Sequence, residues 1–248
     1  MTGRAWRPAT AAENGKTRVT LNLPKGGSCF VVFEPAGSCV PRDRGRASLP
    51  MDAIPITNSW HVSFTYHPGV KAAPPAPVTM ETLRDWTTYG EKGKAASTEL
   101  RYFSGTAAYC TKVTVGSRVP RDRAVLSLGE LPTGLAHVFV NGKDCGVVWC
   151  APWEADISSA VRDGVNDIEI RYTNNWANRL VGDCFLEPAD RVTASNMRYS
   201  REPRTGSGWK LKPTRYSGFA TSDALQPSGL LGPVAIRFYC LTKERKGK

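Results

Sequence analysis

Alternation of apolar and polar residues between short turn signals most constrains how this chain can fold, and it is clearest in residues 124–183. Within 167–172, Ile168, Ile170 and Tyr172 share one face, which predicts a half-buried strand. Asn141-Gly142 lies between two apolar runs and predicts a hairpin, because a type I′ turn needs positive φ at both central residues. We therefore expect strands at 124–128, 135–140, 145–150 and 167–172.

The composition fits an all-β chain of substantial size. The chain has 248 residues, 41% of them hydrophobic, so it can bury a sizeable core. Its 23 Gly and 18 Pro favour short elements joined by frequent turns. The sequence has no long segment of helical period, which argues against a helical protein. It also has no run of about 18 apolar residues, so we expect no membrane partner.

Other segments extend the β pattern on both sides of this stretch. Residues 1–16 are polar and predict a disordered tail, whereas 17–23 and 28–34 predict a hairpin. Residues 80–86 predict a brief helical or turn segment, and 184–215 a long irregular loop. The remaining strands are expected at 56–66, 98–103, 106–115 and 234–241.

One long motif carries a family resemblance. Residues 140–183 read VNGKDCGVVWCAPWEADISSAVRDGVNDIEIRYTNNWANRLVGD, and outlying pieces read RYFSGTAAYCTKV at 101–113 and SGLLGPVAIRFY at 228–239. This pattern resembles the galactose-binding-like jelly roll at the C-terminus of family 106 α-L-rhamnosidases. That domain is related to the sugar-binding domain of family 2 β-glycosidases. Together the pieces cover most of residues 56–240.

The resemblance implies a fold and a domain division. We expect an all-β jelly-roll sandwich of about eight to ten strands over residues 51–248. Residues 1–50 would hold a tail, a short N-terminal hairpin and a linker, as a remnant of a preceding domain. The chain would then be a fragment or one module of a larger enzyme.

The chain start bears on localisation. Residues 1–16 lack the apolar region of a signal peptide, although the family that the chain resembles is usually secreted or periplasmic. Either the chain is cytoplasmic, or it belongs to a longer protein whose signal lies elsewhere.

The seven cysteines include no CxxC pair, which argues against a zinc site. We expect most of them to be buried free thiols. A bond between Cys145 and Cys150 across the hairpin stays open, because spacing alone does not establish it.

Hydrolysis of a glycosidic bond normally needs two carboxylates. Glu154 and Asp156 lie near Trp153 in the sequence. Asp156 is better interpreted as the cap of a turn, and Glu154 as a solvated side chain. The resemblance implies that the catalytic acids belong to a preceding barrel, which this chain lacks. We therefore expect no catalytic residue here and no catalysis by the chain alone. The alternative is a C-terminal part that adds residues to an active site formed mainly elsewhere.

A polar constellation after the strand at 167–172 is the candidate sugar site. Amides, a guanidinium, a carboxylate and aromatic faces together can bind the hydroxyls and the C–H face of a sugar. The alternative is a buried polar network, in which Arg179 pairs with Asp183 and the asparagines tie loop backbones. The candidate carbohydrate-binding residues are Asn174, Asn175, Trp176, Asn178, Arg179, Asp183, Trp153 and Trp209.

Three further points concern the aromatic residues and bound ions. Trp149 lies on an apolar strand and is expected in the core, whereas Trp153 and Trp209 stay open as sugar platforms. His61, His67 and His137 are too scattered for a metal site or a triad. The resemblance allows a structural calcium ion, but no loop concentrates the oxygen ligands that calcium needs, so we expect no cofactor.

The net charge of +11 leaves a third function class open. A basic surface suits nucleic acid, and residues 191–215 interleave arginines with Tyr199 and Trp209. The chain lacks the motifs of common nucleic-acid-binding folds. The expected partners are therefore a plant or bacterial polysaccharide, rhamnose-containing among the candidates, and a catalytic domain or subunit.

Overall fold

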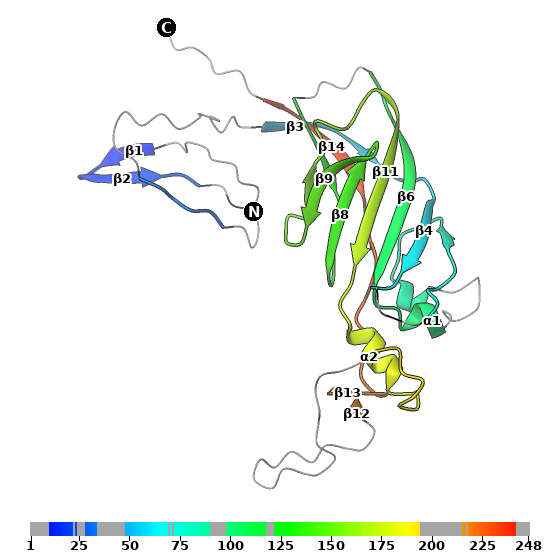
Figure 1. The fold of residues 1–248 in the computed structure, drawn as a ribbon. Helices are drawn as coiled ribbons and strands as arrows, with labels where there is room; N and C mark the ends of the chain where they lie inside the picture. The colour runs from blue at the N-terminus through cyan, green and yellow to red at the C-terminus, as the bar shows by residue number, and fades with distance from the viewer. Residues whose placement is uncertain are drawn as a thin grey trace.

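The chain forms a sandwich of two antiparallel β-sheets in a computed structural model (Figure 1). The structure describes residues 10–21, 23, 28–33, 48–68, 70, 72–89, 98–117, 122–193, 215–216 and 218–241. The described strands of the sandwich number ten, four in one sheet and six in the other. The predicted all-β sandwich and its expected strand number are confirmed.

The six-stranded sheet has the order β5-β4-β6-β11-β8-β9 and the four-stranded sheet the order β10-β7-β14-β3. The first contains β4 (Trp60–Thr65), β5 (Val78–Met80), β6 (Thr106–Val115), β8 (Leu135–Val140), β9 (Lys143–Val148) and β11 (Gly164–Thr173). The second contains β3 (Ser48–Pro55), β7 (Arg123–Ser127), β10 (Glu154–Asp156) and β14 (Ala235–Leu241).

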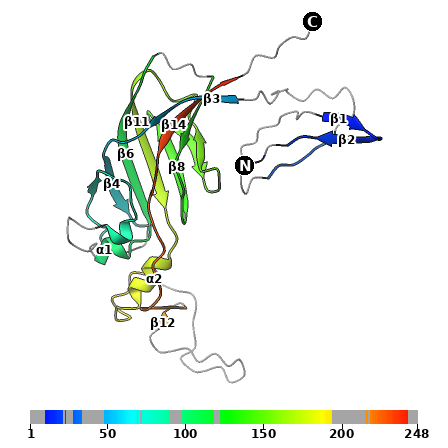
Figure 2. The same cartoon turned by 180° about the vertical axis from the view of Figure 1, so that it is seen from behind.

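The short helices gather at one end of the sandwich. α1 (Thr98–Arg101) precedes β6, and α2 (Ala177–Asp183) follows β11. A 3-10 helix spans Trp86–Thr88, and a small ribbon pairs β12 (Arg215–Tyr216) with β13 (Phe219–Ala220). Both views place α1 and α2 beyond the same ends of the strands (Figures 1 and 2). None of the helices in the described ranges is long and apolar enough to cross a membrane.

The core lies between the two sheets, where alternate residues of each strand point inward. Ile168, Ile170 and Tyr172 of β11 are buried as their alternation predicts. Trp86 is fully buried at the α1 end, with its ring centroid 5.5 Å from that of Tyr172 and 5.6 Å from that of Phe103. The sandwich therefore closes around an aromatic cluster beneath the short helices.

The hairpin at Asn141-Gly142 forms as predicted, with φ of 52° and 76° at the two residues. The N-terminal hairpin also exists, but the expected strand pair was wrong. β1 (Thr10–Glu13) pairs with β2 (Lys16–Val19), and the described residues 28–33 form no strand. The reason is a second Asn-Gly turn: Asn14 and Gly15 also have positive φ. Residues 10–16, predicted as part of a disordered tail, form β1, the turn and the start of β2, whereas residues 1–9 lie outside the described residues.

The strand expected at 98–103 was also wrong. Thr98–Arg101 form α1 instead, and Phe103 N donates to Leu100 O. Leu100 and Phe103 are both buried, at a spacing of three that suits a helical turn rather than a strand. Glu99, Leu100 and Arg101 are also good helix formers.

Candidate functional site

The candidate sugar-binding segment begins where β11 ends, and three of its asparagines tie separate loops together. Asn174 accepts from Gly105 N at 2.9 Å and donates to Phe103 O at 3.0 Å. Asn178, which is 1% exposed, donates to Gln226 O and accepts from Gln226 N, both at 2.8 Å. Asn175 donates to Gln226 Oε1 at 2.7 Å. These amides join the segment after β11 to the turn before β6 and to the chain around Gln226.

The segment was expected as a loop, but residues Ala177–Asp183 form α2. Asn175 Oδ1 accepts from Ala177 N at 3.0 Å and so satisfies one donor of the first turn. A helix of seven residues is marginal by itself, because too few hydrogen bonds offset the cost of nucleation. α2 therefore depends on the contacts that its side chains make with the sandwich.

Arg179 and Asp183 supply much of that contact. Arg179 Nε lies 3.0 Å from Asp183 Oδ1, and the two side chains are 7% and 0% exposed. Asp183 also accepts from Thr193 N at 2.8 Å and from Thr193 Oγ1 at 2.5 Å. The paired Arg179 and Asp183 of the buried-network interpretation are confirmed.

Gly182 lets the Arg179 side chain reach its position. A Cβ at residue 182 would lie 2.4 Å from Arg179 Nη2 and 2.7 Å from Tyr102 Cβ. Arg179 also neighbours Tyr66: burial raises the pKa of the Tyr66 hydroxyl, and the nearby guanidinium opposes that rise. The guanidinium is therefore fixed on several sides by the protein.

A depression of about 460 Å³ opens beside this fixed guanidinium. Arg179 lies over the Tyr102 ring at 6.0 Å, and the centroids of the Tyr102 and Phe185 rings are 5.7 Å apart. The depression is lined by Glu99, Tyr102, Arg179, Gly182, Phe185 and Leu186. It thus combines aromatic rings, a guanidinium and a carboxylate, and of its lining residues only Arg179 was predicted from the sequence.

The predicted tryptophans lie in different surroundings. Trp176 is 41% exposed at the start of α2. Trp153 is half-buried, has φ of 57° and packs against the core beside β10. Trp149 was expected in the core but is 57% exposed. It follows buried Val148 at the end of β9, so the alternation turns it outward. Trp209 lies outside the described residues.

The other candidate side chains mostly pair with neighbours. Asp156 accepts from Ser158 N at 3.1 Å, which confirms its role as the cap of a turn. Glu154 was expected to be solvated, but it is half-buried and its Oε1 lies 3.2 Å from Arg237 Nη1. His137 Nε2 lies 2.9 Å from Asp144 Oδ1. The described residues contain no group of three or more acidic, cysteine or histidine side chains placed to hold a metal ion.

The cysteines differ from the expectation in their burial. Cys145 and Cys150 are free, so no bond crosses the β8–β9 hairpin. Cys110 and Cys150 are exposed, and the other described cysteines, Cys29, Cys145, Cys184 and Cys240, are half-buried. The expectation of buried thiols was therefore wrong, because these residues lie on outward-facing or peripheral positions. Cys39 lies outside the described residues.

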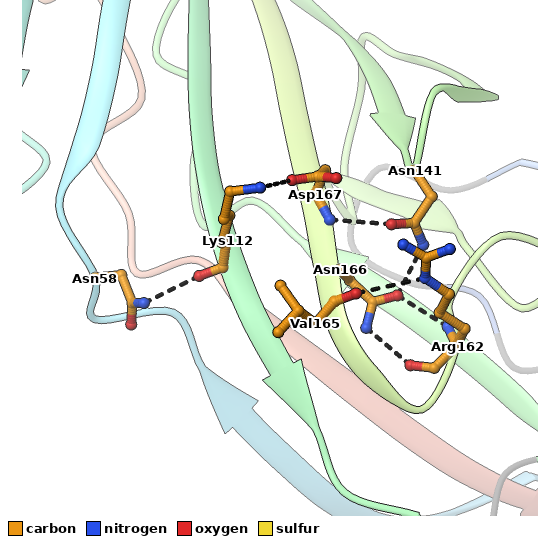
Figure 3. A network of polar contacts seen from close by, with 7 residues as sticks. All are labelled: Asn58, Lys112, Asn141, Arg162, Val165, Asn166 and Asp167. Carbon is orange, nitrogen blue, oxygen red and sulfur yellow. Dashed lines mark hydrogen bonds and ion pairs between the residues drawn. The ribbon is translucent and has the colours of Figure 1, made fainter.

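A second polar centre, not predicted from the sequence, lies at the start of β11 (Figure 3). Asn166 is fully buried and donates to Arg162 O at 2.8 Å and Gly164 O at 3.0 Å. Its Oδ1 accepts from Arg162 N at 2.9 Å and from Asn141 Nδ2 at 2.8 Å. One sequence signal pointed to this centre. Asn166 comes two residues after a turn glycine, at a position that the apolar–polar alternation places on the core side of the strand. Its role here is to join the turn before β11 to the β8–β9 hairpin.

Comparison with known proteins identifies related sequences and structures. No family model matches the chain. A putative β-glucuronidase of Formosa agariphila is 30% identical over 171 residues, which are 64% of this chain and 14% of that protein. The rhamnosidase of Novosphingobium sp. PP1Y aligns over 93% of this chain with a TM-score of 0.64 and 32% identity.

The chain spans only a small part of both relatives, and 19% of the rhamnosidase. The two likenesses agree on the class of protein to which such a domain belongs. The chain is a β-sandwich domain related to those of glycoside hydrolases.

Proposed function

We propose that this chain is the non-catalytic, carbohydrate-binding or scaffold β-sandwich of an α-L-rhamnosidase-like glycoside hydrolase of family 106, placed C-terminal to the catalytic barrel. One observation carries the proposal: the rhamnosidase aligns with 93% of this chain at 32% identity, while the match takes up only 19% of that protein. A module of this kind supplies binding and support, and the catalytic carboxylates belong to the rest of the enzyme. In this division residues 51–248 hold the sandwich and residues 1–50 the preceding part, except that β3 carries the sandwich back to Ser48.

The proposed carbohydrate site lies at the α2 end of the sandwich. Asn175 and Trp176 are exposed there and can reach a ligand, while Asn174, Asn178 and Asp183 hold the segment in place through buried hydrogen bonds. Trp153 and Trp209 remain candidates for further aromatic contacts. The partners of the module are a polysaccharide and a catalytic domain.

A scaffold role is the second candidate, because apolar residues are exposed at the β9 edge of the six-stranded sheet. Trp149 is 57%, Val147 49% and Leu135 38% exposed, and β8 pairs with β9 through this region. Adjacent exposed apolar side chains are typical of protein contacts. In this role the module supports a catalytic domain without touching the substrate.

A glycan-array screen of the purified chain, repeated at low and high salt, tests these functions. We expect binding to plant or bacterial polysaccharides that changes little with salt, because neutral sugars release no counterions. Nucleic acid is the contrasting ligand: phosphate contacts would make affinity fall steeply with salt. Binding to DNA or RNA alone, with that steep fall, would contradict the carbohydrate proposal. Absence of glycan binding would leave the scaffold role.

A further inference from the structure

We propose that the depression between α1 and α2 holds one uncharged pyranose ring, stacked on Phe185 and Tyr102 and hydrogen-bonded by Glu99 and Arg179. The inference rests on the proposed carbohydrate-binding function. It adds the ligand class and three contact residues that the sequence did not indicate.

The depression has the size and lining of a small-molecule site. Its volume of about 460 Å³ falls within the ~300–1,000 Å³ that is usual for ligand pockets. Its walls come from residues close to α1 and α2, which lie at the same end of the sandwich in both views (Figures 1 and 2). A mostly apolar wall with a few polar groups is the usual composition of such sites.

The aromatic wall gives one face for a sugar. The Phe185 ring is tilted by 43° to the Tyr102 ring and is 57% exposed, although phenylalanine gains free energy from burial. A pyranose ring presents C–H groups on its flat face, and these pack well against an aromatic face. A bound ring would therefore cover the exposed part of Phe185.

The polar wall provides donors that are already ordered. Arg179 is held by Asp183, its backbone N donates to Ser104 Oγ at 3.2 Å, and Gly182 leaves room for its Nη2. A guanidinium fixed in this way loses little further entropy when it binds a hydroxyl pair. Glu99 lies exposed on the wall and can accept from sugar hydroxyls.

The charges around the depression favour an uncharged ligand. The Arg179 charge is matched by Asp183, and the α1 residues Arg101 and Glu99 carry opposite charges, with Arg101 over the Tyr102 ring at 5.6 Å. A carboxylate ligand would meet the Glu99 carboxylate on the wall, and it would lose solvation on entry. We therefore infer that neutral pyranoses bind in preference to uronates.

Calorimetric titration with methyl glycosides of neutral pyranoses, and with the methyl glycoside of glucuronic acid, tests this inference. We expect neutral pyranoses to bind at least about tenfold more tightly than the glucuronide. Phe185→Ala should weaken binding by about tenfold, and Glu99→Gln should weaken it several-fold. Trp149→Ala is the matched control, because its side chain is equally exposed, at 57%, but lies at the end of β9. The melting temperature of each variant checks that it is folded.

The outcomes separate this inference from the proposed function. If the glucuronide binds more tightly than every neutral sugar, the inference is overturned. If the chain binds glycans but Phe185→Ala and Glu99→Gln bind as well as the unchanged chain, the module binds carbohydrate elsewhere and only the inference fails. If the unchanged chain binds no sugar at all, the inference fails together with the carbohydrate-binding function.

Discussion

Asp183 and Arg179 form a buried ion pair one helical turn apart, with Arg179 Nε 3.0 Å from Asp183 Oδ1. Because both charged side chains are buried, each relies on the other and on its hydrogen bonds to offset the cost of desolvation. For Asp183 these come from Val192 N, Thr193 N and Thr193 Oγ1. The pair therefore joins α2 to the chain that follows it, and it fixes one wall of the depression.

Removal of one partner should be costly. Asp183→Ala leaves the Arg179 guanidinium buried without its counter-ion, and we expect the free energy of unfolding to fall by about 3–5 kcal/mol. Urea unfolding followed by circular dichroism measures this change.

The control is the pair of Arg171 with Glu169, whose side chains are 49% and 33% exposed. Glu169→Ala should cost about 1 kcal/mol or less, because water screens this pair. Equal losses in the two variants would contradict a special role for the buried pair.

Asn166, the buried asparagine at the start of β11, should contribute strongly to the stability of the fold (Figure 3). Asn166→Ala removes four hydrogen bonds, three of them to backbone groups of Arg162 and Gly164. We expect a loss of about 2–4 kcal/mol in urea unfolding, since each of the four hydrogen bonds contributes ~0.5–1.5 kcal/mol.

Asn58 is the matched asparagine for this test, because it donates one bond, to Lys112 O, from an exposed position. Asn58→Ala should change the free energy of unfolding by about 0.5 kcal/mol or less. A comparable loss in both variants would show that Asn166 does not organise the turn.

The sequence predicted the β-architecture well because period-two patterns and Asn-Gly turns depend on local chemistry. β6 at Thr106–Val115 and the Asn141-Gly142 hairpin follow from such signals. Signals were also missed: Asn14-Gly15 has the same chemistry as Asn141-Gly142, and the buried pair Leu100 and Phe103 has helical spacing.

The candidate site was harder to predict, because it depends on tertiary contacts. The i,i+4 spacing of Arg179 and Asp183 indicated their pairing, but the sequence cannot tell whether a polar pair is buried. Nothing local places Glu99 and Tyr102 next to Phe185, more than 80 residues along the chain. The exposure of Trp149 depends on where β9 ends, which is the least certain part of any strand prediction.

Two glycines with positive φ should tolerate alanine very differently. At Gly134, with φ of 91°, a Cβ would lie 2.0 Å from Thr173 O, whereas at Gly142, with φ of 76°, it would meet nothing within 4 Å. Gly142→Ala should cost about 1–2 kcal/mol from backbone strain alone. Gly134→Ala should cost more, because the turn before β8 must also move away from the end of β11. Thermal unfolding of the two variants compares them, and a smaller loss at Gly134 would contradict the contact.

Buried tyrosines should make the sandwich sensitive to alkali. Burial raises the pKa of Tyr109 well above its usual range, and burial also raises the pKa of Tyr172. In the unfolded chain these phenols ionise near pH ~10, so above that pH the native state binds more protons than the unfolded state. Stability should therefore be complete below pH ~10 and fall as the pH rises further, by up to about 1.4 kcal/mol per pH unit for each such phenol.

Tyr109→Phe separates this titration from other effects of alkali. The variant loses the hydrogen bond that Leu230 N donates to the Tyr109 hydroxyl, so at neutral pH it should be about 1 kcal/mol less stable than the unchanged chain. Above pH ~10 its stability should fall less steeply, because one buried phenol no longer titrates on unfolding. Urea unfolding across this range, with tyrosinate absorbance recorded alongside, gives both slopes. Parallel slopes in the two proteins would mean that Tyr109 ionises equally easily in the folded and unfolded states.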